Sequence, residues 1–351
     1  MNVLKIGELV ANKPIIQGGM GVGVSLSNLA GAVAAEGGIG VISAAQIGFL
    51  DECFENNPLK ANLEALSRHI SIAREKAKDG IIGVNVMVAL KHYEEYIRCC
   101  VENKVDLIIS GAGLPLNLPA LVKGSATKIA PIISSVKAAS VLSGIWDKRY
   151  EAAADAVVIE GPKAGGHLGF KPEQLGEDAS ENLYDKEVKK IIDFVKSSME
   201  KFNRHIPVIF AGGIFEKEDA QHYLDIGCDG VQVSSRFVAT QECDAHHNFK
   251  QAYVDVKENE IGVVKSPVGM PGRAIINSFI TRTQATKEPI TRCYDCLTNC
   301  DPRNIPYCIT KALINAAKGD VENGLVFCGK EAYRINRIET VKDVLHALTP
   351  G

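Results

Sequence analysis

The chain alternates between short apolar runs and longer segments whose apolar residues recur at helical spacing. Glycine or small polar residues end each apolar run and separate it from the next helical segment. This alternation is typical of a parallel sheet whose strands are joined by helices. The predicted strands cover residues 14–19, 39–44, 81–88, 106–112, 128–134, 156–161, 206–213 and 230–235.

Helices are predicted between these strands because most of the intervening segments have one apolar face. Eight strand–helix units favour an α/β fold of the closed (β/α)8 TIM barrel type over an open sheet. An acidic and polar stretch, 170–186, is interpreted as an insertion in the loop after the sixth strand. The predicted helices cover residues 25–38, 59–78, 92–104, 136–149, 187–202 and 217–227.

The alternation of strands and helices stops after residue 240. Residues 241–257 are predicted to be helical, 266–280 to form a loop hinged by proline and glycine that leads into a helix, and 307–351 to form further helices around a short apolar segment. We therefore expect a barrel domain over residues 1–240 and a smaller C-terminal helical cap over 241–351 that packs over the barrel mouth. The last helix of the cap could return to the barrel.

Charge and composition exclude several classes of partner. The formal net charge is −3 and the isoelectric point is near 6.3, which gives no reason to expect a nucleic acid or an anionic membrane. The N-terminus lacks the pattern of a signal peptide, and no uninterrupted apolar run reaches about 18 residues. A cytoplasmic protein is therefore expected.

A TIM barrel binds its ligands at the carboxyl ends of its strands, so the residues that end each apolar run are the first candidates for a site. These residues are rich in glycine and polar groups. Each could also serve the backbone alone, because a buried Asn can satisfy a peptide group and glycines make turns. The candidates are Gln17, Gly18, Gly19, Ser43, Asn85, Gly111, Gly113, Ser134 and Ser135.

The segment IEGPKAGGHLGF, residues 159–170, holds the strongest catalytic candidate, His167. It follows an apolar run that is typical of a central strand, and its glycines can adopt positive φ or let a ligand approach the backbone. A lone histidine in such a loop could also be a solvated residue without a function. The polar strand ends elsewhere in the chain favour the catalytic interpretation.

Two loops predict a phosphate site. AGGI (211–214) and SSRF (234–237) follow the seventh and eighth predicted strands, where TIM barrels often bind phosphate. Their backbone N–H groups and hydroxyls suit an anion.

The cysteines are unevenly distributed, with five of the ten after residue 290. Cys293, Cys296, Cys300 and Cys308 form a Cys-x2-Cys-x3-Cys-x7-Cys array that could hold zinc or an iron–sulfur cluster. Reduced structural cysteines without a metal are the alternative, because the gaps fit neither a zinc ribbon nor a bacterial ferredoxin. The other cysteines are interpreted as small buried residues.

Five segments in this order resemble the nitronate monooxygenase (2-nitropropane dioxygenase-like) family of FMN proteins. The same superfamily holds the FMN-dependent enoyl-acyl-carrier-protein reductases. The resemblance covers roughly residues 10 to 290 and does not include the cysteine array. The segments are QGGMGVGVS (17–25), GVNVMV (83–88), IEGPKAGGHLG (159–169), IPVIFAGGI (206–214) and GVQVSSRF (230–237).

The resemblance implies that FMN binds at the barrel mouth beneath a small helical domain. Residues 17–20 and Asn85 would contact the isoalloxazine, the two loops after the last strands would bind the phosphate, and His167 would contact the substrate. The family usually has Gly-Thr where Ser234 and Ser235 stand, which leaves the phosphate contacts open. The expected cofactor residues are Gln17, Gly18, Gly19, Met20, Ser43, Asn85, Ser134, Glu160, Gly166, Ala211, Gly212, Gly213, Gln232, Ser234 and Ser235.

Two reactions follow from the resemblance. A nitronate monooxygenase would oxidise an alkyl nitronate with dioxygen to a carbonyl compound and nitrite, and the opening QGGMGVGVS favours this reaction. An enoyl reductase would use NAD(P)H and an enoyl thioester, with His167 as a proton donor. A redox carrier or sensor built on flavin or the cysteine array is a third hypothesis. The expected partner is a small molecule, and the oligomeric state is open, a homodimer included.

Overall fold

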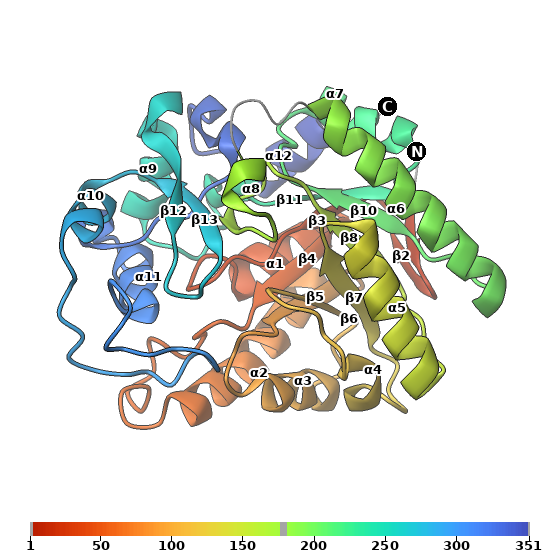
Figure 1. The fold of residues 1–351 in the computed structure, drawn as a ribbon, viewed down its shortest axis with the longest axis horizontal. Helices are drawn as coiled ribbons and strands as arrows, with labels where there is room; N and C mark the ends of the chain where they lie inside the picture. The colour runs from red at the N-terminus through yellow and green to blue at the C-terminus, as the bar shows by residue number, and fades with distance from the viewer. Residues whose placement is uncertain (1–2, 176–180, 350–351) are drawn as a thin grey trace.

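The structure is a computed structural model, and it describes residues 3–175 and 181–349. Eight parallel strands form a closed barrel in the order β10-β11-β3-β4-β5-β6-β7-β8, which confirms the predicted TIM barrel (Figure 1). The barrel strands are β3 (Ile15–Gln17), β4 (Ile39–Ser43), β5 (Ile81–Met87), β6 (Leu107–Gly111), β7 (Lys128–Ile133), β8 (Val157–Glu160), β10 (Val208–Ala211) and β11 (Gly230–Val233).

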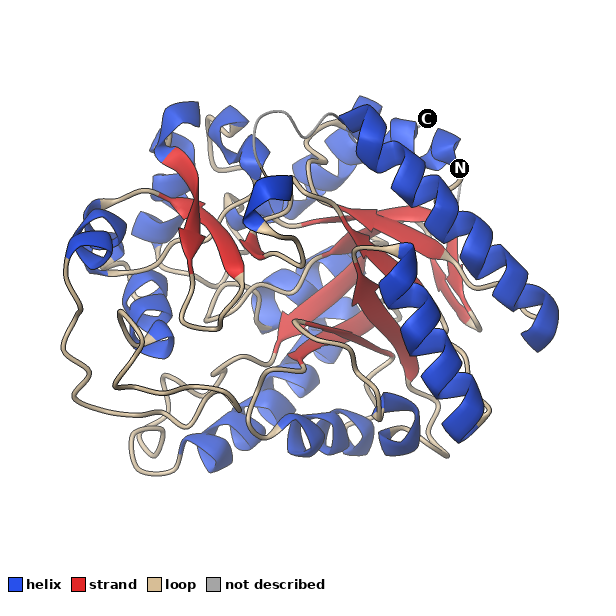
Figure 2. Cartoon of the chain, in the orientation of Figure 1, coloured by secondary structure: helices blue, strands red, loops and turns tan. Residues whose placement is uncertain are grey.

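Helices surround the barrel, and the six helices that the apolar spacing predicts are all present (Figure 2). Two short helices, over 118–121 and 235–238, were not predicted, and the helix predicted over 187–202 begins at Glu181, inside the stretch interpreted as a loop insertion. Capping side chains fix where some of these helices begin. Asn57 caps the longest helix between the early strands, since its side chain accepts the N–H of Lys60, and Pro58 occupies the first turn. The helices are α1 (Ser27–Ala35), α2 (Pro58–Ala77), α3 (Tyr93–Glu102), α4 (Leu118–Leu121), α5 (Val136–Tyr150), α6 (Glu181–Phe202), α7 (Lys217–Ile226) and α8 (Ser235–Val238).

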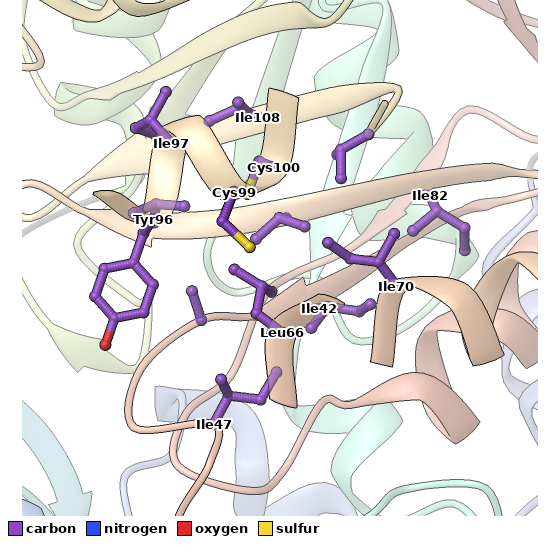
Figure 3. Close-up of a cluster of buried hydrophobic side chains, with 14 of the residues drawn as sticks. Ile42, Ile47, Leu66, Ile70, Ile82, Tyr96, Ile97, Cys99, Cys100 and Ile108 are labelled. Atoms are coloured by element: carbon purple, nitrogen blue, oxygen red, sulfur yellow. The ribbon is translucent and has the colours of Figure 1, made fainter. Parts of the chain in front are cut away.

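The main core lies between the barrel and these helices. Figure 3 shows one part of it, where Leu66 and Ile70 of α2 lie near Ile42 and Ile82 of the barrel, and Ile97 of α3 lies near Ile108. Each of these side chains is at most 1% exposed. Burial of one such side chain contributes roughly 1.5–3 kcal/mol, so the barrel's outer surface is a major source of stability.

A short hairpin closes the barrel at the amino ends of its strands. Its strands are β1 (Leu4–Ile6) and β2 (Leu9–Ala11), which pair antiparallel outside the barrel sheet. Leu4 and Ile6 are fully buried and belong to the same cluster as the residues that fill the barrel interior. The opposite end, at the carboxyl ends of the strands, is left for ligands. The sequence analysis did not predict this hairpin.

The segment after residue 240 is not purely helical. It contains α9 (His247–Asp255), α10 (Ser278–Ala285), α11 (Ile309–Ala317) and α12 (Val341–Leu348), as well as an unpredicted hairpin of β12 (Ile261–Lys265) and β13 (Pro271–Ile275). The hairpin and α9 to α11 lie to one side of the barrel in Figure 1. Short 3-10 turns cover Pro172–Gln174, Glu258–Glu260, Val321–Asn323 and Lys330–Arg334.

Helix α12 packs on the barrel layer, against α1, α7 and α8. Its buried face, which includes Val344 and Leu348, shares a cluster with Leu29 and Val33 of α1. A division of the chain at residue 240 stays a prediction. Among the described helices, none combines the length and the apolar character needed to cross a membrane.

Candidate active site

A cavity of about 250 Å³ opens at the carboxyl ends of the barrel strands, where ligands bind in this fold. The barrel contributes the ends of β4, β5, β8, β10 and β11, and the segment after residue 310 supplies the opposite wall. The structure brings together most of the predicted site residues here. Those that line the cavity are Gly19, Met20, Ser43, Asn85, Glu160, Gly166, His167, Ala211, Gly212, Gly213, Gln232, Ser234 and Ser235.

Three of the expected cofactor residues do not line the cavity. Gln17 is fully buried, and its amide bonds both the N–H and the carbonyl of Val41, which ties β3 to β4. Gly18 donates its N–H to the carbonyl of Val233, at 2.9 Å. The Ser134 hydroxyl donates to the carbonyl of Gly169, also at 2.9 Å, and so supports the loop that carries His167. These residues hold the walls of the site in place.

His167 lies on a two-residue strand, β9 (Gly166–His167), that pairs antiparallel with β13. Its position is therefore set by the C-terminal hairpin as well as by the barrel. The imidazole Nε2 lies 2.7 Å from the hydroxyl of Ser266, and the ring meets that of Phe327 edge to face. The glycine-rich turn predicted for this segment thus contains a short stretch of sheet.

Desolvation controls the charge of His167. Burial in the cavity wall lowers the pKa of the imidazole to about 4. Among the described residues, no carboxylate lies within ion-pair distance of the ring to oppose this shift. His167 is therefore neutral near pH 7, and it can offer a hydrogen bond but not a full positive charge.

Glu160 is the second titratable group of the cavity wall. Its carboxylate accepts the N–H of Gly169 at 2.7 Å. Burial raises the pKa of this carboxyl to about 7, against the opposing effects of the Gly169 hydrogen bond and the positive charge of Arg273. A carboxyl that titrates near neutral pH in a ligand cavity is typical of functional sites.

Gly212 and Gly213, which follow β10, form a glycine cradle whose backbone lies close to the loop after β8. Gly212 and Gly213 have φ of +109° and +84°, values that favour glycine. A Cβ on Gly212 would lie 2.9 Å from the backbone nitrogen of Ala164. Among the described residues, Gln232 Oε1 is a buried oxygen without a hydrogen-bond partner, and it lies in this cavity wall. A buried acceptor left without a donor indicates a place for a ligand N–H or O–H.

Several residues of the site were missed from the sequence. Arg273 is buried and donates through Nη1 to the carbonyls of Pro162 and Ala164, so it fixes the loop before His167. Phe327 and Cys328 form part of the cavity wall. Arg273 could have been found from the sequence, because a charged residue within an otherwise apolar strand is unusual. The short apolar segment around Phe327 was noticed, but nothing local indicates where it packs.

The cysteine array does not form the predicted metal site. Within residues 3–175 and 181–349, no group of three or more His, Cys, Asp or Glu side chains could hold a metal ion. Cys296 and Cys300 instead pack against an apolar cluster that includes Leu297 and Tyr307. Burial raises the pKa of the Cys296 thiol to about 11. The structure therefore does not support zinc or an iron–sulfur cluster.

Known proteins share both the sequence pattern and this fold. A protein of Staphylococcus aureus (strain Newman), named probable nitronate monooxygenase, is 28% identical over 288 residues, which are 76% of each chain. The structure of FabK from Thermotoga maritima superposes with a TM-score of 0.73 at 26% identity and covers 96% of this chain and 92% of that one.

A nitroalkane oxidase from Streptomyces ansochromogenes superposes with a TM-score of 0.71 at 20% identity and covers 96% of this chain and 94% of its own, which supports the barrel fold alone. The family model for nitronate monooxygenase matches residues 3–351, the range that also contains the cavity, His167 and the glycine cradle. With this match over nearly its whole length, the chain belongs to the nitronate monooxygenase family and is an oxidoreductase.

Proposed function

We propose that the cavity binds FMN and that the enzyme oxidises small alkyl nitronates with dioxygen to carbonyl compounds and nitrite. The residues present fit a flavin. Gly212, Gly213 and Gln232 line the cavity where strand ends meet, a place where backbone N–H groups can bind a phosphate, and Gln232 Oε1 needs a donor from a ligand. Lys163 lies at the same rim, where it pairs with Glu331 at 3.2 Å.

The loops after β10 and β11 would hold the phosphate, with the hydroxyls of Ser234 and Ser235 as further contacts. Ser235 already accepts the N–H of Gly329 at 3.0 Å, and its own proton stays available to an anion. Gly19 and Asn85 would face the isoalloxazine, and the site would tolerate no side chain at Gly19, because a Cβ there would lie 2.3 Å from that of Asn85. When bound, FMN supplies the electron transfer and the reaction with dioxygen.

The neutral state of His167 carries the proposal for the substrate. An enoyl reduction needs a group that delivers a proton to carbon, and an imidazole that burial keeps neutral is a weak acid at neutral pH. A nitronate is already an anion, so its oxidation needs no proton transfer from the protein. His167 would bind a nitronate oxygen, while Phe327 and Met20 keep water from the reacting carbon.

The overall reaction balances without a further reductant. Two alkyl nitronates and one dioxygen contain the atoms and charge of two carbonyl compounds and two nitrites. The test is to load the protein with FMN and mix it anaerobically with propyl-2-nitronate, NADH or NADPH in a stopped-flow instrument. We expect the nitronate to bleach the flavin fastest, and aerobic turnover to release acetone and nitrite in equal amounts.

Rapid bleaching by NADH or NADPH without any response to the nitronate would contradict the proposed reaction and favour a reductase. Failure to retain FMN, with FAD or no flavin found by mass spectrometry of the denatured protein, would contradict the proposed cofactor. The first outcome tests the proposed substrate, and the second tests the proposed cofactor.

A further inference from the structure

The imidazole of His167 is held by a serine that lies far from it in the chain. Ser266 directly follows β12 and is 2% exposed, and its Oγ lies 2.7 Å from His167 Nε2. The backbone of His167 is fixed at the same place, because it pairs with Gly272 of β13 and Leu168 donates its N–H to the carbonyl of Pro271 at 2.9 Å. Both contacts come from one hairpin.

Counting protons at Ser266 decides the direction of this hydrogen bond. The backbone N–H of Val268 donates to Ser266 Oγ at 3.3 Å, and a peptide N–H can only donate. The Ser266 hydroxyl can in turn donate one hydrogen bond through its own proton. Within the described residues, His167 Nε2 is the one acceptor in contact with it.

The opposite direction is unfavourable. If His167 Nε2–H donated to Ser266, the hydroxyl would accept two hydrogen bonds and its own proton would have no acceptor in a buried position. A buried donor without a partner costs the full desolvation of that group. The bond from Ser266 to Nε2 is therefore the stable arrangement.

A neutral imidazole whose Nε2 accepts a hydrogen bond carries its proton on Nδ1. Among the described residues, Nδ1 has no partner, and His167 lines the cavity. This ring nitrogen is thus left for a ligand and presents a donor rather than a lone pair. Such a group can hold an anionic oxygen, but it cannot remove a proton from carbon.

We infer that Ser266 is a positioning residue that fixes His167 as the Nδ1–H tautomer, so that the enzyme takes preformed nitronates in preference to neutral nitroalkanes. The inference deepens the proposed function and rests on it for the identity of the substrate. A neutral nitroalkane must lose its α-proton to a base before it becomes a nitronate. The tautomer that Ser266 selects removes His167 from that role.

The tautomer can be measured without any turnover. The FMN-loaded protein is labelled with ¹⁵N-histidine, and the ring signals of His167 are assigned by their loss in His167→Gln. We expect a protonated Nδ1 and an unprotonated Nε2, which resonate far apart. A protonated Nε2 in the parent protein would overturn the inference.

Ser266→Ala removes the donor, and Ser266→Thr keeps a hydroxyl at the same place. We expect Ser266→Ala to populate the other tautomer and to lower the ratio of kcat/KM for propyl-2-nitronate over 2-nitropropane by about 10-fold, the scale for one lost hydrogen bond between neutral groups. Ser266→Thr should restore the parent's ratio. Flavin content and thermal unfolding verify that both variants are folded.

An Ala variant with an unchanged spectrum and an unchanged ratio would also overturn the inference. If the parent shows the Nδ1–H tautomer but no nitronate activity, the positioning role of Ser266 stands and the proposed function fails. A merely structural role of Ser266 would lower both kcat/KM values together and leave the tautomer in place.

Discussion

The rings of His167 and Phe327 meet edge to face with their centroids 4.9 Å apart, although the two residues come from different parts of the chain. The barrel loop carries His167, and the C-terminal segment brings Phe327 against it through a bridge between Phe327 and Ala274 of β13. The site is therefore complete when the C-terminal segment is in place against the barrel. This relationship makes His167 the first residue to test.

His167→Gln should retain FMN and lower turnover of propyl-2-nitronate by about 10²-fold, because a hydrogen bond to the reacting anion is lost or misplaced. Steady-state kinetics per bound flavin measures the effect. The control is His205→Gln, since His205 is exposed and pairs with Asp229 outside the cavity. Loss of flavin at unchanged turnover per flavin would instead mean that His167 supports the fold.

The glycine cradle can be tested with a single methyl group. Gly212→Ala places a Cβ 2.9 Å from a backbone nitrogen at a φ of +109°, so we expect weaker FMN binding by at least about 10-fold together with a loss of stability. Equilibrium dialysis of FMN measures the affinity. The matched control is Gly144→Ala within α5, where a Cβ meets nothing within 4 Å. Equal FMN affinity in both variants would contradict the placement of the phosphate.

Glu160 should make stability depend on pH. Because its pKa is raised from 4.5 to about 7 in the folded state, the protein holds a proton there that the unfolded chain releases. This contribution is complete below pH 4.5 and is lost as the pH rises through 7, and we expect it to amount to about 1–3 kcal/mol. Glu160→Gln should abolish the loss.

Unfolding by urea at pH 5 and pH 8 gives the two free energies. Relative to the parent, the free energy of unfolding of the Gln variant should be higher at pH 8 than at pH 5. Both proteins are measured without flavin. An equal pH dependence in the two proteins would show that Glu160 is already ionised at pH 5.

The buried guanidinium of Arg273 should stabilise the loop before His167. Arg273→Met leaves the carbonyls of Pro162 and Ala164 without their donor, and we expect a loss of roughly 1.5–3 kcal/mol in the free energy of unfolding and a lower kcat. Calorimetry and kinetics measure the two effects. Arg303→Met is the control, because that side chain is 90% exposed. A stable but slow Met variant would show that Arg273 acts on the site more than on the fold.

The thiols should differ in reactivity. Cys293 is exposed, while burial raises the pKa of the Cys328 and Cys243 thiols to about 12. The thiolate is the reactive form, so a disulfide reagent such as Ellman's reagent should modify Cys293 first. Cys328 and Cys243 should react only after denaturation. Rapid reaction of Cys328 in the folded protein would mean that the C-terminal segment opens away from the cavity.

The barrel could be predicted because its strands are mostly apolar and largely buried on both faces, as Ile39–Ser43 is. The β12–β13 hairpin could not. Ile261–Lys265 is mostly exposed or half-buried, its apolar run is short, and the prolines and glycines after it resemble a hinge. Its other partner, β9, is two residues long, so no periodicity exists to detect.

The site, too, could be predicted only in part. Glycines and polar residues at strand ends identified the cavity wall on the barrel side, since topology alone brings strand ends together. Ser266 and Phe327 carried no such signal, because their roles arise from long-range pairing with β9. Spacing between Cys293 and Cys308 could not reveal that Cys296 turns into an apolar cluster.

The three-stranded sheet of β12, β13 and β9 also has a consequence for synthesis on the ribosome. Translation produces the eight barrel strands and the His167 loop before the hairpin at 261–275 and the segment around Phe327. A nascent chain therefore contains all eight barrel strands before it contains the hairpin and the phenylalanine that hold His167.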